Sequence, residues 1–166
     1  QLSATGTKDA TTFLRGDNSF AAPGAGMTLI NATSGSSNVT SITVDNVFTS
    51  TYDFYKIFMS FRVSNDAGYY FRYIKADGTD RTSDYINLDG RLKSSHEFTV
   101  FNPFLSSTQS TITNNGVGYH DSVNNYLKII QANINTNVES HRGFKIVANS
   151  GNFNPYSIKV FGVTNV

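Results

Sequence analysis

The densest group of acidic residues lies between positions 77 and 89 and consists of Asp77, Asp80, Asp84 and Asp89. Two carboxylates about 5 to 10 Å apart could cleave a glycosidic bond, and several carboxylates together could hold calcium. The four aspartates lack the spacing of a calcium-binding loop and fall where turns are expected. We therefore interpret them as solvated turn residues, and we predict no catalytic residue.

The three histidines, His96, His120 and His141, are far apart and match no zinc-binding spacing. Without cysteine, the chain has no disulfide, no thiolate metal ligand and no thiol nucleophile. It also has no G-x-S-x-G motif and no glycine-rich phosphate-binding motif. We expect no metal, no cofactor and no enzymatic activity.

Aromatic residues that lie next to polar ones in the sequence indicate a binding function. Sugar sites commonly combine an aromatic face with amide, carboxylate or guanidinium groups. The candidate ligand-binding residues in predicted loops and strand ends are Tyr52, Tyr69, Tyr70, Asp80, Arg81 and Tyr126. One shallow site of this kind would bind at about millimolar strength, and several linked copies would raise the avidity by about a hundredfold.

Charge and hydropathy exclude several partners. The formal charge is +1 and no basic cluster occurs, so we expect neither nucleic acid nor an anionic membrane as a partner. No apolar run approaches the roughly 20 residues that a membrane span needs, so we expect no membrane insertion. Because the sequence starts at Gln1 without Met, we expect it to be part of a longer chain.

The elements that must position these residues are strands. Apolar and polar residues alternate from Tyr55 to Val63, which predicts a central strand with one buried face. Met27 to Ile30 begins the body, and Asn31 to Asn38 is predicted as a loop. Further strands are predicted at 42–44, 69–75, 85–92, 97–105, 111–119, 126–134, 143–148 and 156–163. We expect an all-β, antiparallel, jelly-roll-like sandwich of about eight to nine strands, with an immunoglobulin-like sandwich as the alternative.

A short symmetrical segment precedes this body. A type II′ turn at Gly16-Asp17 would place Phe13 opposite Phe20 in a two-stranded hairpin. Such a hairpin is marginal in water, and its exposed apolar residues would be covered if several copies of the chain met there. We interpret Arg15 to Asp17 as part of this turn, and not as an integrin-binding tripeptide. The expected oligomer junction consists of Phe13, Leu14 and Phe20.

The pattern T-T-F-L-R-G-D-x-x-(aromatic)-A-x-P, from Thr11 to Pro23, resembles the junction segment that precedes the C-terminal head in bacteriophage tail fibres and related virion fibre proteins. In those proteins the aromatic is usually Trp, and Gly-Thr or Gly-Ser often follows Asp. Here the corresponding residues are Asn18, Ser19 and Phe20. The ending from Tyr156 to Val163 is similar to the last strand of such heads.

This resemblance implies a homotrimer located in the virion, on a tail fibre or another exposed appendage, with other virion proteins bound through a preceding part of the chain. We expect residues 1–26 to be a stalk end, hairpin junction and linker, and residues 27–166 to be a β-sandwich head. The expected function is non-catalytic attachment to a host-surface glycan or envelope component. The alternative is a virion decoration or head-fibre protein without a receptor role. An enzymatic reading would depend on Asp80 or Asp84.

Overall fold

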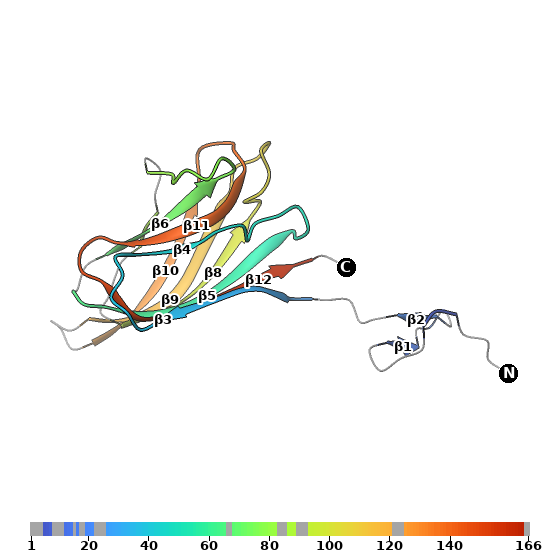
Figure 1. Ribbon diagram of the computed structural model, residues 1–166, viewed down its shortest axis with the longest axis horizontal. Helices are drawn as coiled ribbons and strands as arrows, with labels where there is room; N and C mark the ends of the chain where they lie inside the picture. Colours follow the sequence, from blue (N-terminus) through green and yellow to red (C-terminus); the bar gives the residue numbers. More distant parts are fainter. Residues whose placement is uncertain are drawn as a thin grey trace.

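The computed structural model describes residues 5–7, 12–14, 16, 19–21, 26–65, 68–82, 86–88, 93–120 and 125–164 (Figure 1). Its strands are β1 (Phe13–Leu14), β2 (Phe20–Ala21), β3 (Thr28–Gly35), β4 (Ser41–Val44), β5 (Phe54–Val63), β6 (Tyr69–Lys75), β7 (Ile86–Leu88), β8 (Lys93–Phe101), β9 (Thr111–His120), β10 (Asn125–Ile134), β11 (His141–Ala148) and β12 (Phe153–Val163). In these residues there is no helix that is long and apolar enough to cross a membrane.

Two antiparallel sheets form the body, which confirms the predicted all-β sandwich. The large sheet has the strand order β10-β9-β8-β5-β12-β3, and the small sheet has the order β4-β11-β6-β7. Figure 1 shows the two sheets facing each other. The described residues therefore contribute six strands to one sheet and four to the other, slightly more than the eight to nine expected.

The first strand of the body pairs with the last, and the strands between them pair in the same nested order. β3 pairs with β12, β4 with β11, β5 with β8, and β6 with β7. Successive pairs alternate between the large and the small sheet, as in one long antiparallel ribbon that is rolled up. The hairpin of β9 and β10 follows β8 in the chain and extends the large sheet beside it.

The core lies between the sheets and is rich in aromatic rings. β5 alternates as predicted, and five of its side chains are buried, namely Tyr55, Ile57, Met59, Phe61 and Val63. From the small sheet, Phe71 and Phe144 stack at 5.0 Å between ring centroids. Phe98 of β8 packs 5.8 Å from Phe71 and joins the two layers. Aromatic rings thus fill the space between the sheets, where each buries a large apolar area.

Two predicted strand boundaries are wrong for identifiable reasons. The segment from Asn31 to Gly35 was expected in a loop, but it continues β3 because it pairs with β12. Pairing with a neighbouring strand here outweighs a composition typical of loops. The strand expected at 97–105 ends at Phe101 instead. Asn102 has a φ of 54°, in the left-handed region, and Pro103 follows it, so the strand cannot continue.

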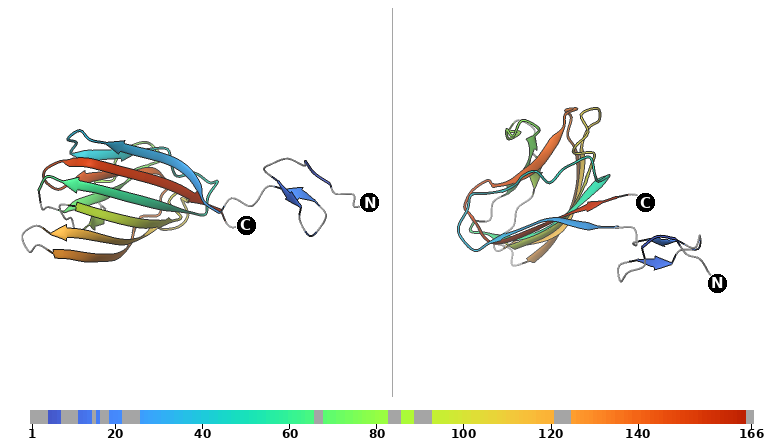
Figure 2. Two further views of the ribbon diagram at one scale, coloured as in Figure 1. Left: turned by 90° about the horizontal axis from the view of Figure 1, so that it is seen from below. Right: turned by 45° about the vertical axis from the view of Figure 1, so that its right-hand side comes forward.

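The amino-terminal hairpin forms with a different register from the one predicted. Leu14 lies opposite Phe20, and Phe13 lies opposite Ala21, so the expected pairing of Phe13 with Phe20 is wrong. Five residues separate Leu14 from Phe20, which is too many for a two-residue turn. The Phe20 amide also donates to the carbonyl oxygen of Thr5 at 2.7 Å. Figure 2 shows this two-stranded sheet standing apart from the sandwich.

Candidate ligand-binding groove

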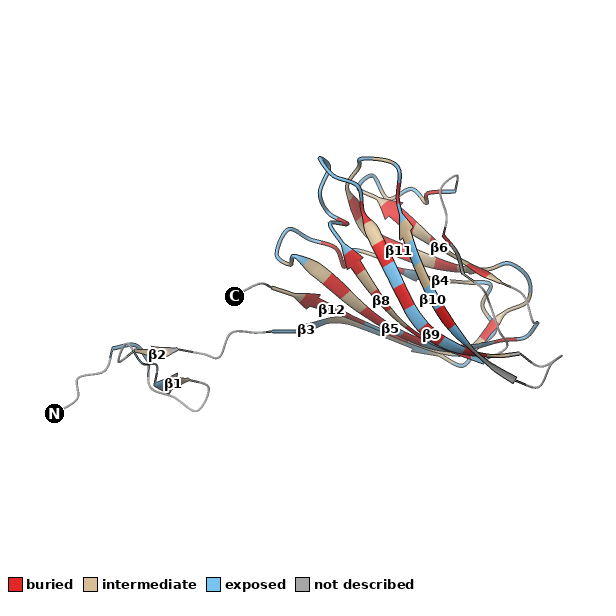
Figure 3. Cartoon of the chain, turned by 180° about the vertical axis from the view of Figure 1, so that it is seen from behind, coloured by how far each residue is buried: buried red, intermediate tan, exposed pale blue. Residues whose placement is uncertain are grey.

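A row of four serines crosses the outer face of the large sheet, the face turned away from the core, and it begins with Ser34 of β3 opposite Ser157. In the strand register, Ser60 of β5 lies between Ser157 of β12 and Ser95 of β8, and Val117 of β9 continues the row. Exposed and buried residues alternate along these strands (Figure 3). Because serine side chains are short, the surface of the sheet is hollow along this row.

Two hollows, of about 660 and 540 Å³, lie over the serine row and share Ser60, Ser95, Val117 and Ser157. They form one continuous depression, which we name the outer-face groove. Each hollow has a volume within the range of small-molecule sites, about 300 to 1,000 Å³. The groove is therefore large enough for a saccharide unit.

Aromatic rings flank the groove. On one side Phe58 is 39% exposed and packs edge to face against Phe161, with 5.7 Å between ring centroids. On the other side lies Tyr119, which is half-buried and follows the outward-facing Lys93 in the register. Tyr156 also borders the groove, but it is paired with the buried Phe61, and its ring covers Gly35 of β3 and packs against the core.

Polar and charged groups complete the lining of the groove. Glu97 is paired with Lys56, whose Nζ lies 2.5 Å from its Oε1, and Asn115 follows Glu97 in the register. Four further basic residues line the groove, namely Arg62 of β5, Lys93 of β8, Lys128 of β10 and Lys159 of β12. Rings, hydroxyl groups and charges are therefore combined on one concave surface, an arrangement that can bind a sugar ring by its face and by its polar groups.

The candidate residues named from the sequence do not come together in a site. Tyr69 is fully buried, and its Oη lies 2.6 Å from Nε2 of His96, so it is not part of the surface. Tyr52 is half-buried, its ring lies over Gly162, and it packs edge to face against Tyr55. Both tyrosines stabilise the core and the sheet surface beside it.

Of the remaining candidates, Tyr70, Asp80 and Arg81 lie on the small sheet or near it, whereas Tyr126 belongs to β10 of the large sheet. Tyr70 donates from Oη to Oδ1 of Asn149 at 3.0 Å. Asp80 accepts from Nζ of Lys145 at 2.7 Å. Arg81 is buried and pairs with Glu139, and the side chain of Tyr126 lies outside the described residues. The side chains of Tyr70, Asp80 and Arg81 are thus occupied by contacts within the protein.

Sequence reasoning missed the groove because its lining comes from five different strands. Each serine is an ordinary outward-facing residue within its own strand. One signal was present in β5, where Lys56, Phe58, Ser60 and Arg62 occupy the outward positions of the clearest alternating segment. That mixture of ring, hydroxyl group and charges on one strand face could have indicated a surface with a binding role.

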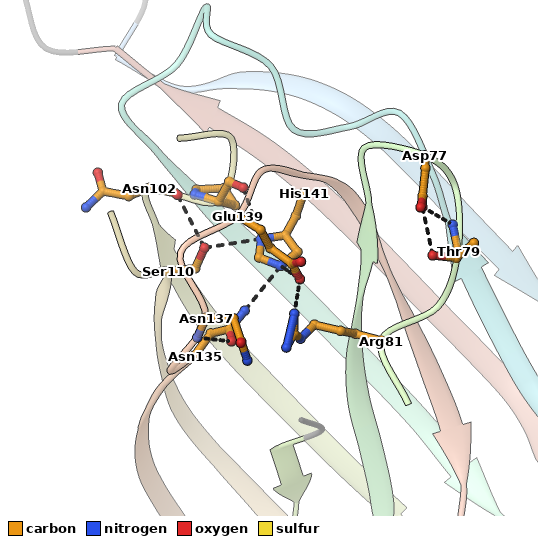
Figure 4. A network of polar contacts seen from close by, with 10 residues as sticks. Asp77, Thr79, Arg81, Asn102, Ser110, Asn135, Asn137, Glu139 and His141 are labelled. Carbon is orange, nitrogen blue, oxygen red and sulfur yellow. Dashed lines mark hydrogen bonds and ion pairs between the residues drawn. The ribbon is translucent and has the colours of Figure 1, made fainter. Parts of the chain in front are cut away.

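A buried polar network joins three loops at one end of the sandwich (Figure 4). His141 Nε2 lies 3.3 Å from Oε1 of Glu139 and 3.1 Å from Nδ2 of Asn135. His141 Nδ1 lies 3.3 Å from Oγ of Ser110 and 3.2 Å from the carbonyl oxygen of Pro103. Burial lowers the pKa of His141, although the neighbouring Glu139 acts in the opposite direction.

Serine, histidine and glutamate are the residue types of a hydrolytic triad, but this network does not have the accessibility that a triad needs. Ser110 and His141 are both fully buried, so a substrate cannot reach the serine hydroxyl. Arg81 pairs with the same Glu139 carboxylate. We interpret the network as a structural connection between the loops after β6, β8 and β10. Among the described residues, no three metal-ligating side chains gather.

The chain matches no protein-family model, and no curated protein matches it in sequence.

Proposed function

We propose that this chain is the head of a bacteriophage fibre that attaches to a host-surface saccharide through the outer-face groove without cleaving it. The observation that carries the proposal is the groove itself, in which Phe58 and Tyr119 flank a row of serine hydroxyl groups. Aromatic faces beside hydroxyl and charged groups suit sugar rings, which have both apolar faces and polar edges. The junction-like segment before the sandwich supports a fibre as the context.

The strand pairing supports a jelly roll as the finer description of the sandwich. A jelly roll is an antiparallel ribbon rolled into two four-stranded sheets. The pairs β3·β12, β4·β11, β5·β8 and β6·β7 give such a ribbon, with β9 and β10 as an added hairpin. Jelly rolls are common among viral and lectin domains, which agrees with a displayed binding head.

Binding without hydrolysis is favoured by the acidic groups of the groove. A glycosidase needs two carboxylates on either side of the scissile bond. Among the described residues that line the groove, Glu97 is the one carboxylate, and it is paired with Lys56. The groove therefore has hydroxyl groups and cations to hold a saccharide, but it does not have the pair of acids that would cleave it.

We also propose that several copies of the head are joined, so that several grooves face the host together. The resemblance to fibre junctions implies a trimer, and the amino-terminal hairpin stands apart from the sandwich with Leu14 48% exposed. Three linked grooves would strengthen a weak single contact by about a hundredfold. Contact between hairpins of neighbouring copies would remove the exposed leucine from water.

A second candidate function is virion decoration, and the exposed face of β10 favours it. Ile130 and Ile134 are 68% and 61% exposed on this edge strand of the large sheet. An edge with apolar side chains is suited to packing against another virion subunit. Locating the protein in the particle by electron microscopy separates the two functions, because a tail-tip position favours attachment and a capsid position favours decoration.

The attachment function is tested with two phenylalanines of equal exposure. Phe58 lies in the groove and Phe104 in the loop after β8, and both are 39% exposed. We expect Phe58→Ala to weaken binding to extracted host-surface polysaccharide by about tenfold, because a stacked ring contributes about 1 kcal/mol or more. Phe104→Ala should leave binding unchanged. Equal binding by both variants would contradict the assignment of the groove.

A further inference from the structure

Two basic residues of the outer-face groove, Arg62 and Lys93, lie opposite each other, and among the described residues neither has an acidic partner. Arg62 and Lys93 are directly opposite in the pairing of β5 with β8, and both are exposed. Like charges at directly opposite positions of an antiparallel pair are unfavourable. Tyr119 follows Lys93 in the same row. The row therefore consists of two adjacent cations and an aromatic ring, and a bound anion would remove the repulsion between the cations.

Within the residues that the structure describes, acidic side chains elsewhere do not neutralise these cations. The described ion pairs of the body join Lys56 to Glu97, Arg142 to Asp45, Lys145 to Asp80, and Arg81 to Glu139. Within the described part of the chain, Arg62, Lys93, Lys128 and Lys159 take part in none of these pairs. The lining of the groove thus has a clear excess of positive charge, although the whole chain has a formal charge of only +1.

A second copy of the chain is a poor occupant for the groove. In a two-fold interface the same patch would meet itself, so the four cations would face four cations. In a head-to-tail interface they would need an acidic patch on the neighbour. Among the described residues, most acidic side chains are already paired, including Asp45, Asp80, Glu97 and Glu139. The groove is therefore better suited to an anionic ligand than to a sister chain.

We propose that the outer-face groove selects an acidic saccharide, with its anionic group between Arg62 and Lys93 and a sugar ring beside Tyr119. This inference rests on the proposed attachment function and adds the chemical class of the ligand. A carboxylate, as in a uronic acid, and a sulfate or phosphate ester share the chemistry that two adjacent cations recognise. The serine hydroxyl groups next to this row supply further hydrogen bonds to a saccharide.

The test uses the full chain and three polymers: polygalacturonate, its carboxyl-reduced form, and dextran sulfate. The variant Arg62→Gln/Lys93→Gln removes the cation pair. Its matched control is Arg72→Gln/Lys75→Gln, which makes the same change in charge on β6, outside the groove. We expect the groove variant to lose about tenfold in affinity for polygalacturonate at low salt, and the control to lose less than about twofold. Binding to dextran sulfate as well would extend the specificity from carboxylates to anionic esters.

The outcomes distinguish this inference from the function on which it rests. If the carboxyl-reduced polymer binds as tightly as polygalacturonate, and Phe58→Ala still weakens that binding, the attachment function stands and the preference for acidic saccharides is wrong. If none of the polymers binds, the preference for acidic saccharides is wrong, and the attachment function is decided by the binding of extracted host-surface polysaccharide. If Phe58→Ala and the cation-pair variant both bind like the unchanged chain, both proposals fail. Tighter binding to the single-stranded polymer poly(dT) than to any saccharide would also overturn the inference, because stacking and cations serve nucleic acids as well.

Discussion

His96 shows how a single residue connects the groove to the core. Its Nδ1 lies 3.0 Å from Oδ1 of Asn114, which can only accept, so Nδ1 carries the proton and donates it. Its Nε2 then accepts from Oη of Tyr69. The imidazole ring is stacked between Phe61 and Phe98, at 5.8 and 5.6 Å between ring centroids. The neutral ring therefore has a partner for each nitrogen.

This environment makes the stability of the head depend on pH. Burial lowers the pKa of His96 to about 4, from an ordinary value of 6.5. Because the folded pKa lies below the unfolded one, the stabilisation is complete above about pH 6.5 and is lost as the pH falls towards about 4. Between these values we expect the free energy of unfolding to fall by up to about 1.4 kcal/mol per pH unit from this residue alone.

The measurement for His96 is urea denaturation at pH 7 and pH 5, with the unchanged chain and with His96→Gln. Glutamine keeps a donor and an acceptor at this position but does not titrate. His141 also has a lowered pKa, so the variant should retain part of the pH dependence and lose the contribution of one proton. An identical loss of stability between the two pH values in both proteins would contradict the role of His96.

At the scale of the elements, a glycine in β11 allows this strand to lie close to the backbone of β4. The pairing of β11 with β6 is irregular between His141 and Gly143. A Cβ added at Gly143 would meet the carbonyl oxygen of Val44 and would lie 2.8 Å from Cα of Asp45. Both are backbone atoms, which cannot turn aside as a side chain could. A glycine at this irregularity therefore lets two strands of the small sheet approach closely.

We expect Gly143→Ala to destabilise the head by about 1 to 3 kcal/mol, because the backbone of β4 has to move. The control is Gly26→Ala, since no atom lies within 4 Å of a Cβ added at Gly26. Thermal unfolding of the two variants provides the comparison. A melting temperature of Gly143→Ala equal to that of the unchanged chain would show that β11 and β4 are not in close contact at Gly143.

Elements with a strong local pattern could be predicted from the sequence, and those set by distant pairing could not. β5 was predicted because its own residues alternate from Tyr55 to Val63. The continuation of β3 through Asn31 to Gly35 depends on β12, which lies more than a hundred residues later. The register of the hairpin was predicted wrongly because symmetry in the residue types favoured Phe13 opposite Phe20, whereas the chain pairs Leu14 with Phe20.

At the scale of the whole molecule, the groove could not be predicted because its residues come from β5, β8, β9, β10 and β12. Their arrangement side by side depends on the strand order of the large sheet, which no local pattern specifies. Of the tyrosines chosen from the sequence, Tyr52, Tyr69 and Tyr70 are occupied by contacts within the protein. We therefore place the candidate site on a sheet face and not in the loops.

We also predict the oligomeric state, which is a property of the whole molecule. We expect the chain to be a trimer at micromolar concentration, with Leu14 at the contact between copies. Leu14→Asp should shift the mass measured by light scattering towards that of a monomer, because it places a charge in that contact. Leu105→Asp is the control, since Leu105 lies on the sandwich and is 44% exposed, compared with 48% for Leu14. A monomeric unchanged chain would remove the argument for linked grooves.

The most direct test of the account is the binding of the full chain to host-surface polysaccharide, measured for the unchanged protein, Phe58→Ala and Phe104→Ala. We expect the unchanged protein and Phe104→Ala to bind alike, and Phe58→Ala to bind about tenfold more weakly. Equal binding by all three proteins would show that the outer face of the large sheet is not the surface that meets the host.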